Sequence, residues 1–354
     1  MPRHTFSRGS FFGMTGLIAT VFCSTLAIPG TAFSQSPRGV YSIPGNGKKI
    51  QDPVLTNPNV DGISLRQNWA DIEKTEGIYD WSYFDGQIIR VAAAGKKVLL
   101  RVMTMGGRPA WVSNAVKAAG GKFFKWNDNG VNASIPLFWD PTFLAKKKDL
   151  IAAMGAHYKN NPTVAIVVTS FANAVTEDWN VPHTPDLVTQ WERLGYTTAN
   201  MLSAGQQLID ATMVAFPNKW VTLAVGGNGT ALDGDEQEVP RGAVDTARAK
   251  WPGRLIVQKN DLSTCIPVAP GTDSLYSMIW DYQPDVAGQM ITAAYNDSTY
   301  KISCGVPLDI GIALMTTVDL AVAYGEKRVE IYEGDVVRYP VAIAYAHTAL
   351  LAVP

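Results

Sequence analysis

The feature that most constrains the fold is a regular alternation of short, apolar, β-rich runs with longer segments of helical character. The run VAIVVTSFA at 164–172 is almost continuously apolar, as expected for a parallel strand buried on both faces. Eight such runs occur, at 40–43, 62–66, 97–103, 164–172, 220–225, 255–259, 286–292 and 328–332. Eight strands, each followed by a helix or a long loop, predict an α/β fold of the closed (β/α)8 barrel type, the TIM barrel.

The segments between these runs support that prediction. Apolar residues recur at helical spacing in seven segments, at 83–94, 141–158, 185–216, 242–250, 273–282, 309–324 and 340–351. A long excursion rich in Gly, Asn and Trp occupies 106–140. The competing fold, a doubly wound open sheet, usually carries a glycine-rich phosphate loop after its first strand, and Gly45-Asn46-Gly47 is too short for one.

The N-terminus has the pattern of an export signal. A basic start is followed by an apolar run at 15–28, a Pro-Gly break, and the small-x-small motif Ala32-Phe33-Ser34. The apolar run is short for a transmembrane helix, although an uncleaved anchor is the alternative. We therefore expect a signal peptide at 1–34, a single barrel domain at 35–354, and a secreted or periplasmic protein with no stable membrane association after cleavage.

The composition limits the partners. Charged residues make up 17% of the chain and the formal net charge is -1, so no basic patch predicts nucleic-acid binding. Four His and three Cys show no metal-ligand spacing, and we expect neither a metal nor another cofactor. Cys265 and Cys304 form an even pair that an oxidising compartment would allow to join, but their spacing does not show that they are close.

The active site of such a barrel lies at the carboxyl ends of its strands. The residues at or just after these ends are rich in amides and arginines, which bind sugar hydroxyls. With the aromatic residues of the third loop, which also could be packing residues, they predict a saccharide site lined by Arg66, Trp69, Arg101, Trp111, Trp139, Asn173, Gln258, Asn260 and Gln289.

Two carboxyl groups are the predicted catalytic pair. Glycoside hydrolysis needs one to protonate the leaving oxygen and another to attack the sugar or to activate water. Glu177 follows the fourth strand beside an aromatic residue, and the alternative is a solvated loop carboxylate. Glu330 lies within the apolar eighth strand, where it either faces a polar barrel mouth or forms a buried ion pair with Arg66 or Arg101. Glu333 or Asp335 could replace Glu330.

The stretch GISLRQNWADIEKTEGIYDWSYFDGQI at 62–88 resembles the second-strand region of clan-A glycoside hydrolases, which include the family 42 beta-galactosidases. The resemblance continues more weakly through the fourth strand and implies a TIM barrel that acts on glycosidic bonds. It assigns to Arg66 the support of the nucleophile. The matching positions are Arg66, Trp69, Glu73, Gly77, Tyr79, Asp80, Trp81 and Asp85.

The chain departs from that pattern at both catalytic positions. The clan places its acid in an Asn-Glu dipeptide after the fourth strand, whereas this chain has Asn173-Ala174. The clan nucleophile ends the seventh strand, where this chain has Gln289, unless the strand count is shifted by one and Glu330 takes that place. The alternatives to a glycosidase are a carbohydrate-binding pseudoenzyme with an incomplete catalytic pair, and a hydrolase or lyase for another small molecule.

Overall fold

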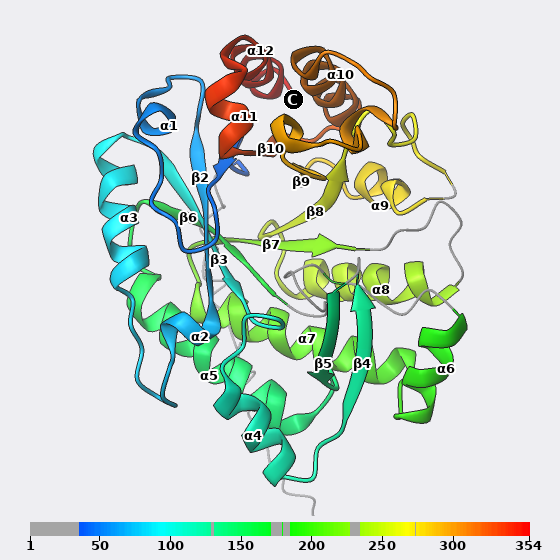
Figure 1. The fold of residues 1–354 in the computed structure, drawn as a ribbon. Coiled ribbons are helices and arrows are strands. Elements are labelled where there is room, and N and C mark those ends of the chain that lie inside the picture. The colour runs from blue at the N-terminus through cyan, green and yellow to red at the C-terminus, as the bar shows by residue number, and fades with distance from the viewer. Residues whose placement is uncertain (1–34, 129–130, 171–178, 180–184, 227–233, 273) are drawn as a thin grey trace, which may run out of the picture. The chain divides into compact units, whose positions relative to one another are not determined.

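The computed structural model describes residues 35–128, 131–170, 179, 185–226, 234–272 and 274–354, so the expected signal peptide lies outside the described residues. Eight parallel strands of the described chain close into a barrel in the order β1-β10-β9-β8-β7-β6-β3-β2 (Figure 1). They are β1 (Gly39–Ile43), β2 (Gly62–Asn68), β3 (Lys97–Met103), β6 (Val164–Val168), β7 (Trp220–Val225), β8 (Leu255–Leu262), β9 (Val286–Met290) and β10 (Arg328–Tyr332). The predicted (β/α)8 barrel and its strand count are confirmed.

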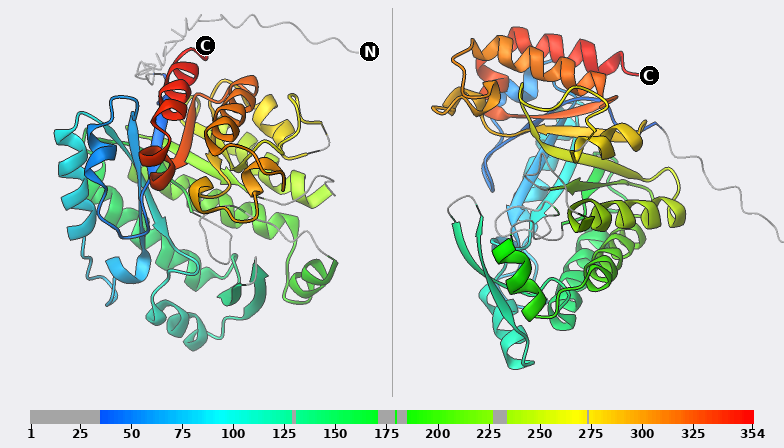
Figure 2. Two further views of the ribbon diagram at one scale, coloured as in Figure 1. Left: turned by 45° about the horizontal axis from the view of Figure 1, so that its top comes forward. Right: turned by 90° about the vertical axis from the view of Figure 1, so that its right-hand side faces the viewer.

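Helices connect successive strands and cover the outside of the barrel (Figures 1 and 2). Their bounds are α1 (Asp52–Thr56), α2 (Trp69–Ile72), α3 (Ser82–Ala93), α4 (Ala110–Ala118), α5 (Pro141–Tyr158), α6 (Pro185–Arg193), α7 (Thr198–Ala215), α8 (Gly234–Lys250), α9 (Tyr276–Asp281), α10 (Ile310–Ala323), α11 (Glu333–Arg338) and α12 (Pro340–Leu351). Two short 3₁₀ turns, η1 (Ala294–Asn296) and η2 (Lys301–Ser303), follow β9.

Three connections differ from the sequence-based expectation. The excursion after β3 contains α4 and a hairpin of β4 (Phe123–Asp128) and β5 (Val131–Pro136), which were not predicted. The helix α8 begins at Gly234 rather than at residue 242. The single helix expected at 185–216 is two helices, because Gly195 adopts a φ of +98° and the Thr197 side chain then accepts a hydrogen bond from the Asn200 amide at 3.0 Å, which starts α7.

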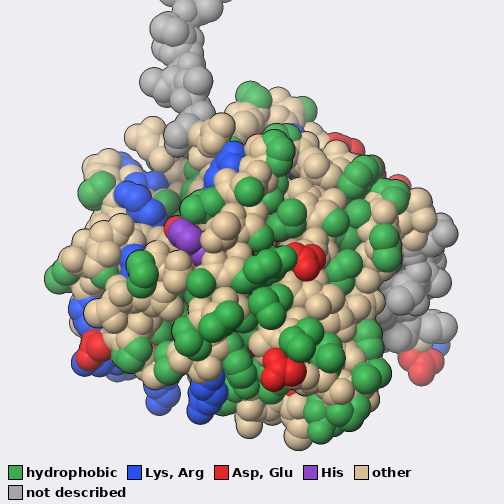
Figure 3. Space-filling view, turned by 90° about the horizontal axis from the view of Figure 1, so that it is seen from above, with side chains coloured by type: hydrophobic (Ala, Val, Ile, Leu, Met, Phe, Trp, Pro, Cys, Tyr) green, Lys and Arg blue, Asp and Glu red, His purple; other side chains and the backbone are tan. Residues whose placement is uncertain are grey.

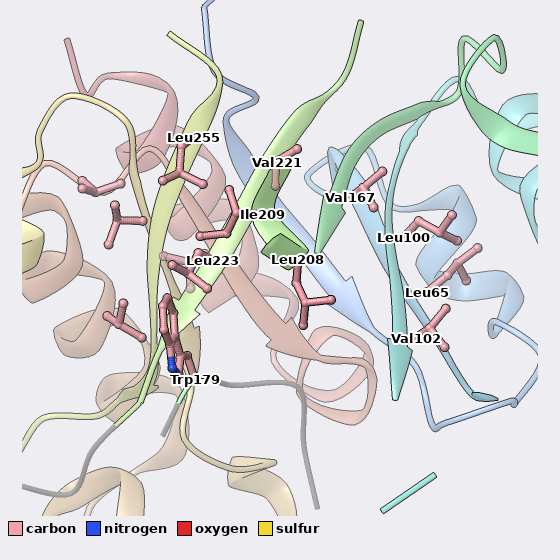
Figure 4. Close-up of a cluster of buried hydrophobic side chains, with 14 of the residues drawn as sticks. Leu65, Leu100, Val102, Val167, Trp179, Leu208, Ile209, Val221, Leu223 and Leu255 are labelled. Carbon is pink, nitrogen blue, oxygen red and sulfur yellow. The ribbon is translucent and has the colours of Figure 1, made fainter. Parts of the chain in front are cut away.

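The barrel has apolar side chains on both faces of its strands. Outward-facing side chains pack against the helices, and Leu208 and Ile209 of α7 approach the strands in Figure 4. A second buried cluster, which we call the lumen cluster, fills the barrel interior and consists of Tyr41, Leu99, Ile166, Val168, Trp220, Ile256 and Ala287. The part of the lumen that this cluster occupies, nearer the starts of the strands, is therefore a packed core rather than a pore.

Cations directly before the strands close several helix-to-strand turns. Lys96 Nζ donates hydrogen bonds to the carbonyls of Asn57 and Val60, at 2.7 and 2.6 Å. Lys219 and Arg254 bond in the same way to carbonyls of the preceding turns. Because buried carbonyl groups need donors, these side chains stabilise the end of the barrel where the strands begin.

A disulfide links the loops that follow two neighbouring strands. Cys265 comes after β8 and Cys304 comes after β9, and their sulfur atoms are 2.00 Å apart with a Cα–Cα distance of 5.4 Å. The sequence allowed this pair without showing that it is close, and the fold brings it together.

No helix among the described residues combines the length and the apolar character needed to cross a bilayer.

The last two long helices form a sparsely charged face of the barrel wall. Hydrophobic side chains spread over this face in Figure 3, and Ile312 of α10 and Val341 of α12 are 49% and 76% exposed. The Tyr345 hydroxyl of α12 donates a hydrogen bond to the Asp319 carboxylate of α10. Side-chain packing and this bond hold the two helices side by side.

We expect Gly155→Ala to destabilise the barrel. A Cβ at Gly155 of α5 would lie 2.6 Å from both the Cβ and the carbonyl oxygen of Ala215, so α5 and α7 would have to separate. The expected loss is about 1–3 kcal/mol in the free energy of unfolding, measured by urea denaturation. Gly86→Ala in α3 is the matched control: nothing lies within 4 Å of its Cβ, and it should stabilise by about 0.5–1 kcal/mol. Equal effects of the two variants would contradict the close α5–α7 contact.

Candidate active site

A polar layer lies inside the barrel on the side where the strands end. Arg101, Gln258 and Gln289 each follow a residue of the lumen cluster by two positions, at Leu99, Ile256 and Ala287. Because side chains two apart on a strand share a face, these polar groups also point inward, one step nearer the carboxyl ends. Arg328 and Glu330 of β10 share that interior.

Glu330 is held by two arginines at the centre of this layer. Its side chain is 0% exposed. Arg101 Nη2 donates to both carboxylate oxygens, at 3.1 Å to Oε1 and 2.9 Å to Oε2, and Arg328 Nη1 donates to Oε1 at 2.7 Å. The predicted ion pair between Glu330 and Arg101 is thus present, whereas Arg66 makes no described contact with Glu330.

Two glutamines extend the network across the lumen. Gln289 accepts a hydrogen bond from Arg101 Nη1 at 2.9 Å, and Gln258 accepts one from Arg328 Nη2 at 2.7 Å. Gln258 Nε2 in turn donates to Asn260 Oδ1 at 2.7 Å. Four strands, β3, β8, β9 and β10, therefore contribute to one connected set of hydrogen bonds, which we call the lumen network.

The network determines the charge of Glu330. Burial by itself raises the pKa of this carboxyl group, but the positive charges of Arg101 and then Arg328 outweigh it and hold the pKa below its ordinary value. Glu330 is therefore an ionised carboxylate in a buried site. Such a group can stabilise a developing positive charge or attack an electrophilic carbon.

The residues nearer the mouth form a separate set. Arg66 donates from Nε to the Pro44 carbonyl at 3.2 Å, and its guanidinium lies 5.9 Å from the centre of the Tyr332 ring. Asn46 Nδ2 donates to Asn68 Oδ1 at 2.7 Å. Arg66 and Asn68 are only partly buried, so the mouth offers hydrogen-bond donors and acceptors to a polar ligand.

The three predicted tryptophans pack away from the lumen network. Trp69 is 0% exposed and donates from Nε1 to Glu73 Oε2 at 2.6 Å, so it is a core residue with no surface for a ligand. Trp111 packs edge-on against Trp69 and donates to the Glu73 carbonyl at 2.9 Å. Trp139 joins an aromatic group with Trp191 and Tyr196. Trp111 and Trp139 remain partly exposed.

Glu177 and Asn173 lie outside the described residues, so their predicted roles stay predictions. The described chain before them is firmly anchored. Lys147 Nζ donates to the Ser170 carbonyl at 2.9 Å, and the hydroxyl groups of Thr104 and Ser170 are 2.8 Å apart. Burial lowers the pKa of Lys147 to about 7. The chain that leaves β6 toward Glu177 therefore starts from a fixed point.

The two alternative carboxylates bind the backbone of neighbouring loops. Glu333 accepts hydrogen bonds from the Gln51 amide at 2.8 Å and from its side chain at 3.0 Å. Asp335 accepts from the amides of Ala294 and Tyr295, at 2.9 and 2.7 Å, and burial raises its pKa to about 6. Both residues shape loops at the mouth, and neither joins the lumen network.

Sequence reasoning missed Arg328, although the sequence contains a signal for it. Arg328 and Glu330 are two apart in the predicted strand, and this period places both on one face. A buried carboxylate needs a nearby cation, so this spacing makes Arg328 a candidate partner of Glu330.

Among the described residues no cluster of three or more His, Cys, Asp or Glu could hold a metal ion.

We expect glutamine substitutions at Glu326 and Glu330 to change the free energy of unfolding in opposite directions. Glu330→Gln leaves two buried guanidinium groups without their anion and should cost about 3–5 kcal/mol in unfolding free energy at pH 7. Because the pKa of Glu330 is lowered in the folded state, its stabilising contribution is present above the ordinary glutamate pKa of about 4.3 and is lost as the pH falls below it. The free energy of unfolding of this variant should therefore fall less steeply in acid than that of the wild type.

Glu326→Gln is the matched control. Glu326 is also 0% exposed, but its oxygens have no hydrogen-bond partner among the described residues, and burial raises its pKa well above the ordinary value. Folding therefore opposes its ionisation, and the variant should become more stable than the wild type as the pH rises above about 4.3. Chemical denaturation between pH 3 and pH 8 measures both trends, and parallel pH profiles for the two variants would refute the opposite charge states.

Comparison with known proteins gives a family pattern and a shared fold. The family model described as beta-galactosidase, of glycoside hydrolase family 42, matches residues 56–179, which span β2 to the segment after β6. A comparison with curated proteins finds no match. The catalytic domain of the beta-amylase from Paenibacillus polymyxa superposes with a TM-score of 0.58 at 11% identity, covering 88% of this chain and 98% of that domain.

Two beta-galactosidases have the same fold. That from Rahnella sp. R3 has a TM-score of 0.54 at 12% identity over 91% of this chain, and that from Marinomonas ef1 has 0.51 at 11% identity over 88%. This chain spans 57% and 59% of their respective lengths. The family model covers β2 to the segment after β6, and the solved structures share the fold of this chain. The chain is a (β/α)8 barrel that resembles the clan-A glycoside hydrolases, with the family 42 beta-galactosidase pattern across its second to fourth barrel strands.

Proposed function

We propose that this protein is an exported glycoside hydrolase that cleaves the O-glycosidic bonds of a saccharide by a two-carboxylate mechanism. The observation that carries the proposal is the lumen network. Among the described strand residues of the barrel, Glu330 is the carboxylate that belongs to this network, and two arginines keep it ionised. An anion at the base of a barrel mouth suits a reaction whose transition state is an oxocarbenium ion.

The two carboxyl groups need opposite protonation states. Glu330, lowered in pKa, would serve as the nucleophile or as the stabilising anion. Glu177 would serve as the acid that protonates the leaving oxygen, since it follows β6 in the sequence and β10, which carries Glu330, lies across the barrel from β6. In this division Arg101 and Arg328 take the supporting role that the family resemblance suggests for Arg66.

Polar groups near the mouth would bind the sugar hydroxyls. Gln289 is 7% exposed and Asn260 is partly buried, and both belong to the lumen network. Arg66 adds a cation nearer to solvent, and Trp111 and Trp139 add aromatic edges in the loop after β3. An uncharged saccharide matches this mixture of amides, one guanidinium and aromatic rings.

Export rests on the N-terminal sequence and on the disulfide. The pattern at 1–34 is that of a signal peptide, and the Cys265–Cys304 bond is of a kind that persists in oxidising compartments. Both features support a secreted or periplasmic enzyme.

A second candidate is a saccharide-binding barrel without hydrolytic activity. The observation that favours it is the complete burial of Glu330, whose two oxygens are both occupied by arginine donors. Gln289 on the seventh strand and Ala174 after Asn173 add to it, because both stand where related hydrolases carry carboxylates. Such a protein would use the mouth residues to bind a sugar and would lack turnover.

We expect turnover in the wild type and its loss in either carboxylate variant. A panel of aryl glycosides and polysaccharides identifies the substrates, and on a polysaccharide Glu177→Gln and Glu330→Gln should each lower kcat by at least about 100-fold. Glu326→Gln, a buried glutamate outside the lumen network, is the control and should keep wild-type kcat. Thermal melting verifies that each variant is folded at the assay temperature.

The leaving group separates the two roles. The phenolate of an activated aryl glycoside leaves without being protonated when the glycosidic bond breaks, so Glu177→Gln should lose much less activity on such a substrate than on a polysaccharide. Glu330→Gln should lose activity on both substrates. Saccharide binding without turnover in the wild type would favour the second candidate, and wild-type turnover in both variants would overturn the assigned pair.

A further inference from the structure

A second cavity lies at the opposite end of the barrel, where the strands begin. It has a volume of about 480 Å³. Its described walls come from the first residues of β1, β2, β3, β6 and β7 or from those directly before them. The charged and aromatic groups of these walls are Arg38, Tyr41, Asp61, Lys97, Lys219 and Trp220. The lumen cluster fills the barrel between this cavity and the lumen network, so the two sites are separate.

Three cations line the cavity, and their positions are fixed by hydrogen bonds. Lys219 is 8% exposed and donates from Nζ to the Asn161 carbonyl at 2.6 Å. Lys97 donates to the neighbouring Pro162 carbonyl at 3.2 Å. Arg38 donates from Nη1 to the Val353 carbonyl and from Nη2 to Gln35 Oε1. Because an ammonium group has three donors, each of the two lysines keeps hydrogen-bonding capacity for a ligand.

The Arg38 side chain, which lines the cavity, has one donor with no partner among the described residues. Arg38 Nε is buried, and no acceptor lies within hydrogen-bond distance of it among the described residues. The one carboxylate of the described wall is that of Asp61, whose Oδ2 accepts from the Val40 amide and lies 2.9 Å from both this amide and His347 Nδ1. A buried donor without an acceptor is costly, so the Arg38 side chain keeps unsatisfied hydrogen-bonding capacity at the cavity wall.

The cations also repel one another. The pKa of Lys219 is lowered by its burial and then by the charge of Lys97, and the pKa of Lys327 is lowered by burial and then by the charge of Arg38. The described wall carries three positive charges against the single negative charge of Asp61. A bound anion would relieve this repulsion.

We propose that this cavity binds a small organic anion through its carboxylate or phosphate group. The oxyanion would lie among Arg38, Lys97 and Lys219, and its organic part would contact the rings of Tyr41 and Trp220. The cavity is large enough for a ligand of several heavy atoms.

Calorimetric titration tests the proposal with inorganic phosphate, sulfate and acetate as probes, each against sodium chloride at the same ionic strength. The wild type should bind at least one oxyanion saturably and melt at a higher temperature in its presence. Preference for phosphate and sulfate over acetate would identify a phosphate site, and the reverse order a carboxylate site. Equal responses to the oxyanions and to chloride would overturn the proposal, because they indicate screening alone.

Two variants and one control separate a built site from general charge. Lys97→Gln removes an exposed cation and should fold normally while weakening oxyanion binding about tenfold, as expected for one charge-assisted hydrogen bond. Arg38→Gln should weaken it similarly. Lys122→Gln removes an exposed lysine from the excursion after β3 and should bind like the wild type. Equal affinity in Lys97→Gln, Lys122→Gln and the wild type would refute the site.

Discussion

The ion pair of Glu330 with two arginines inside the barrel is the interaction on which the candidate site depends. A carboxylate taken out of water is stable only when cations and donors replace its hydration, and Arg101 and Arg328 do so from β3 and β10. Gln258 and Gln289 then orient the two guanidinium groups. The charge that a glycosidase would need at its reacting centre is thus maintained by side chains from strands distant in the sequence.

The interior of the barrel is divided along its axis. Apolar side chains of the lumen cluster fill one part, and the lumen network begins two residues later along β3, β8 and β9. This change from apolar to polar within one strand leaves polar side chains at the carboxyl ends, where the loops can vary, and a packed core beneath them. At the other end, Lys96, Lys219 and Arg254 bond to turn carbonyls, and Lys219 also borders the second cavity.

Local signals predicted the elements that follow a regular pattern. Apolar runs and helical periodicity located all eight strands and most helices, because burial on a barrel imposes these periods on the sequence. The break between α6 and α7 and the β4–β5 hairpin were missed. The break depends on one glycine conformation and one capping threonine, and the hairpin on strand pairing within a loop. Neither feature produces a long periodic signal.

The sequence by itself determined the fold class and the strands that carry polar residues at their ends. It also predicted that a glutamate inside an apolar strand faces a polar barrel mouth or is paired. Only the tertiary structure decided the partners. It joined Glu330 to Arg101, 229 residues away, and to Arg328, and it brought Cys265 to Cys304. It also placed Trp69 in the core and three cations around a cavity at the far end. The physical reason is that side-chain periodicity records which face of an element is buried, whereas closure of the barrel alone determines which buried groups meet.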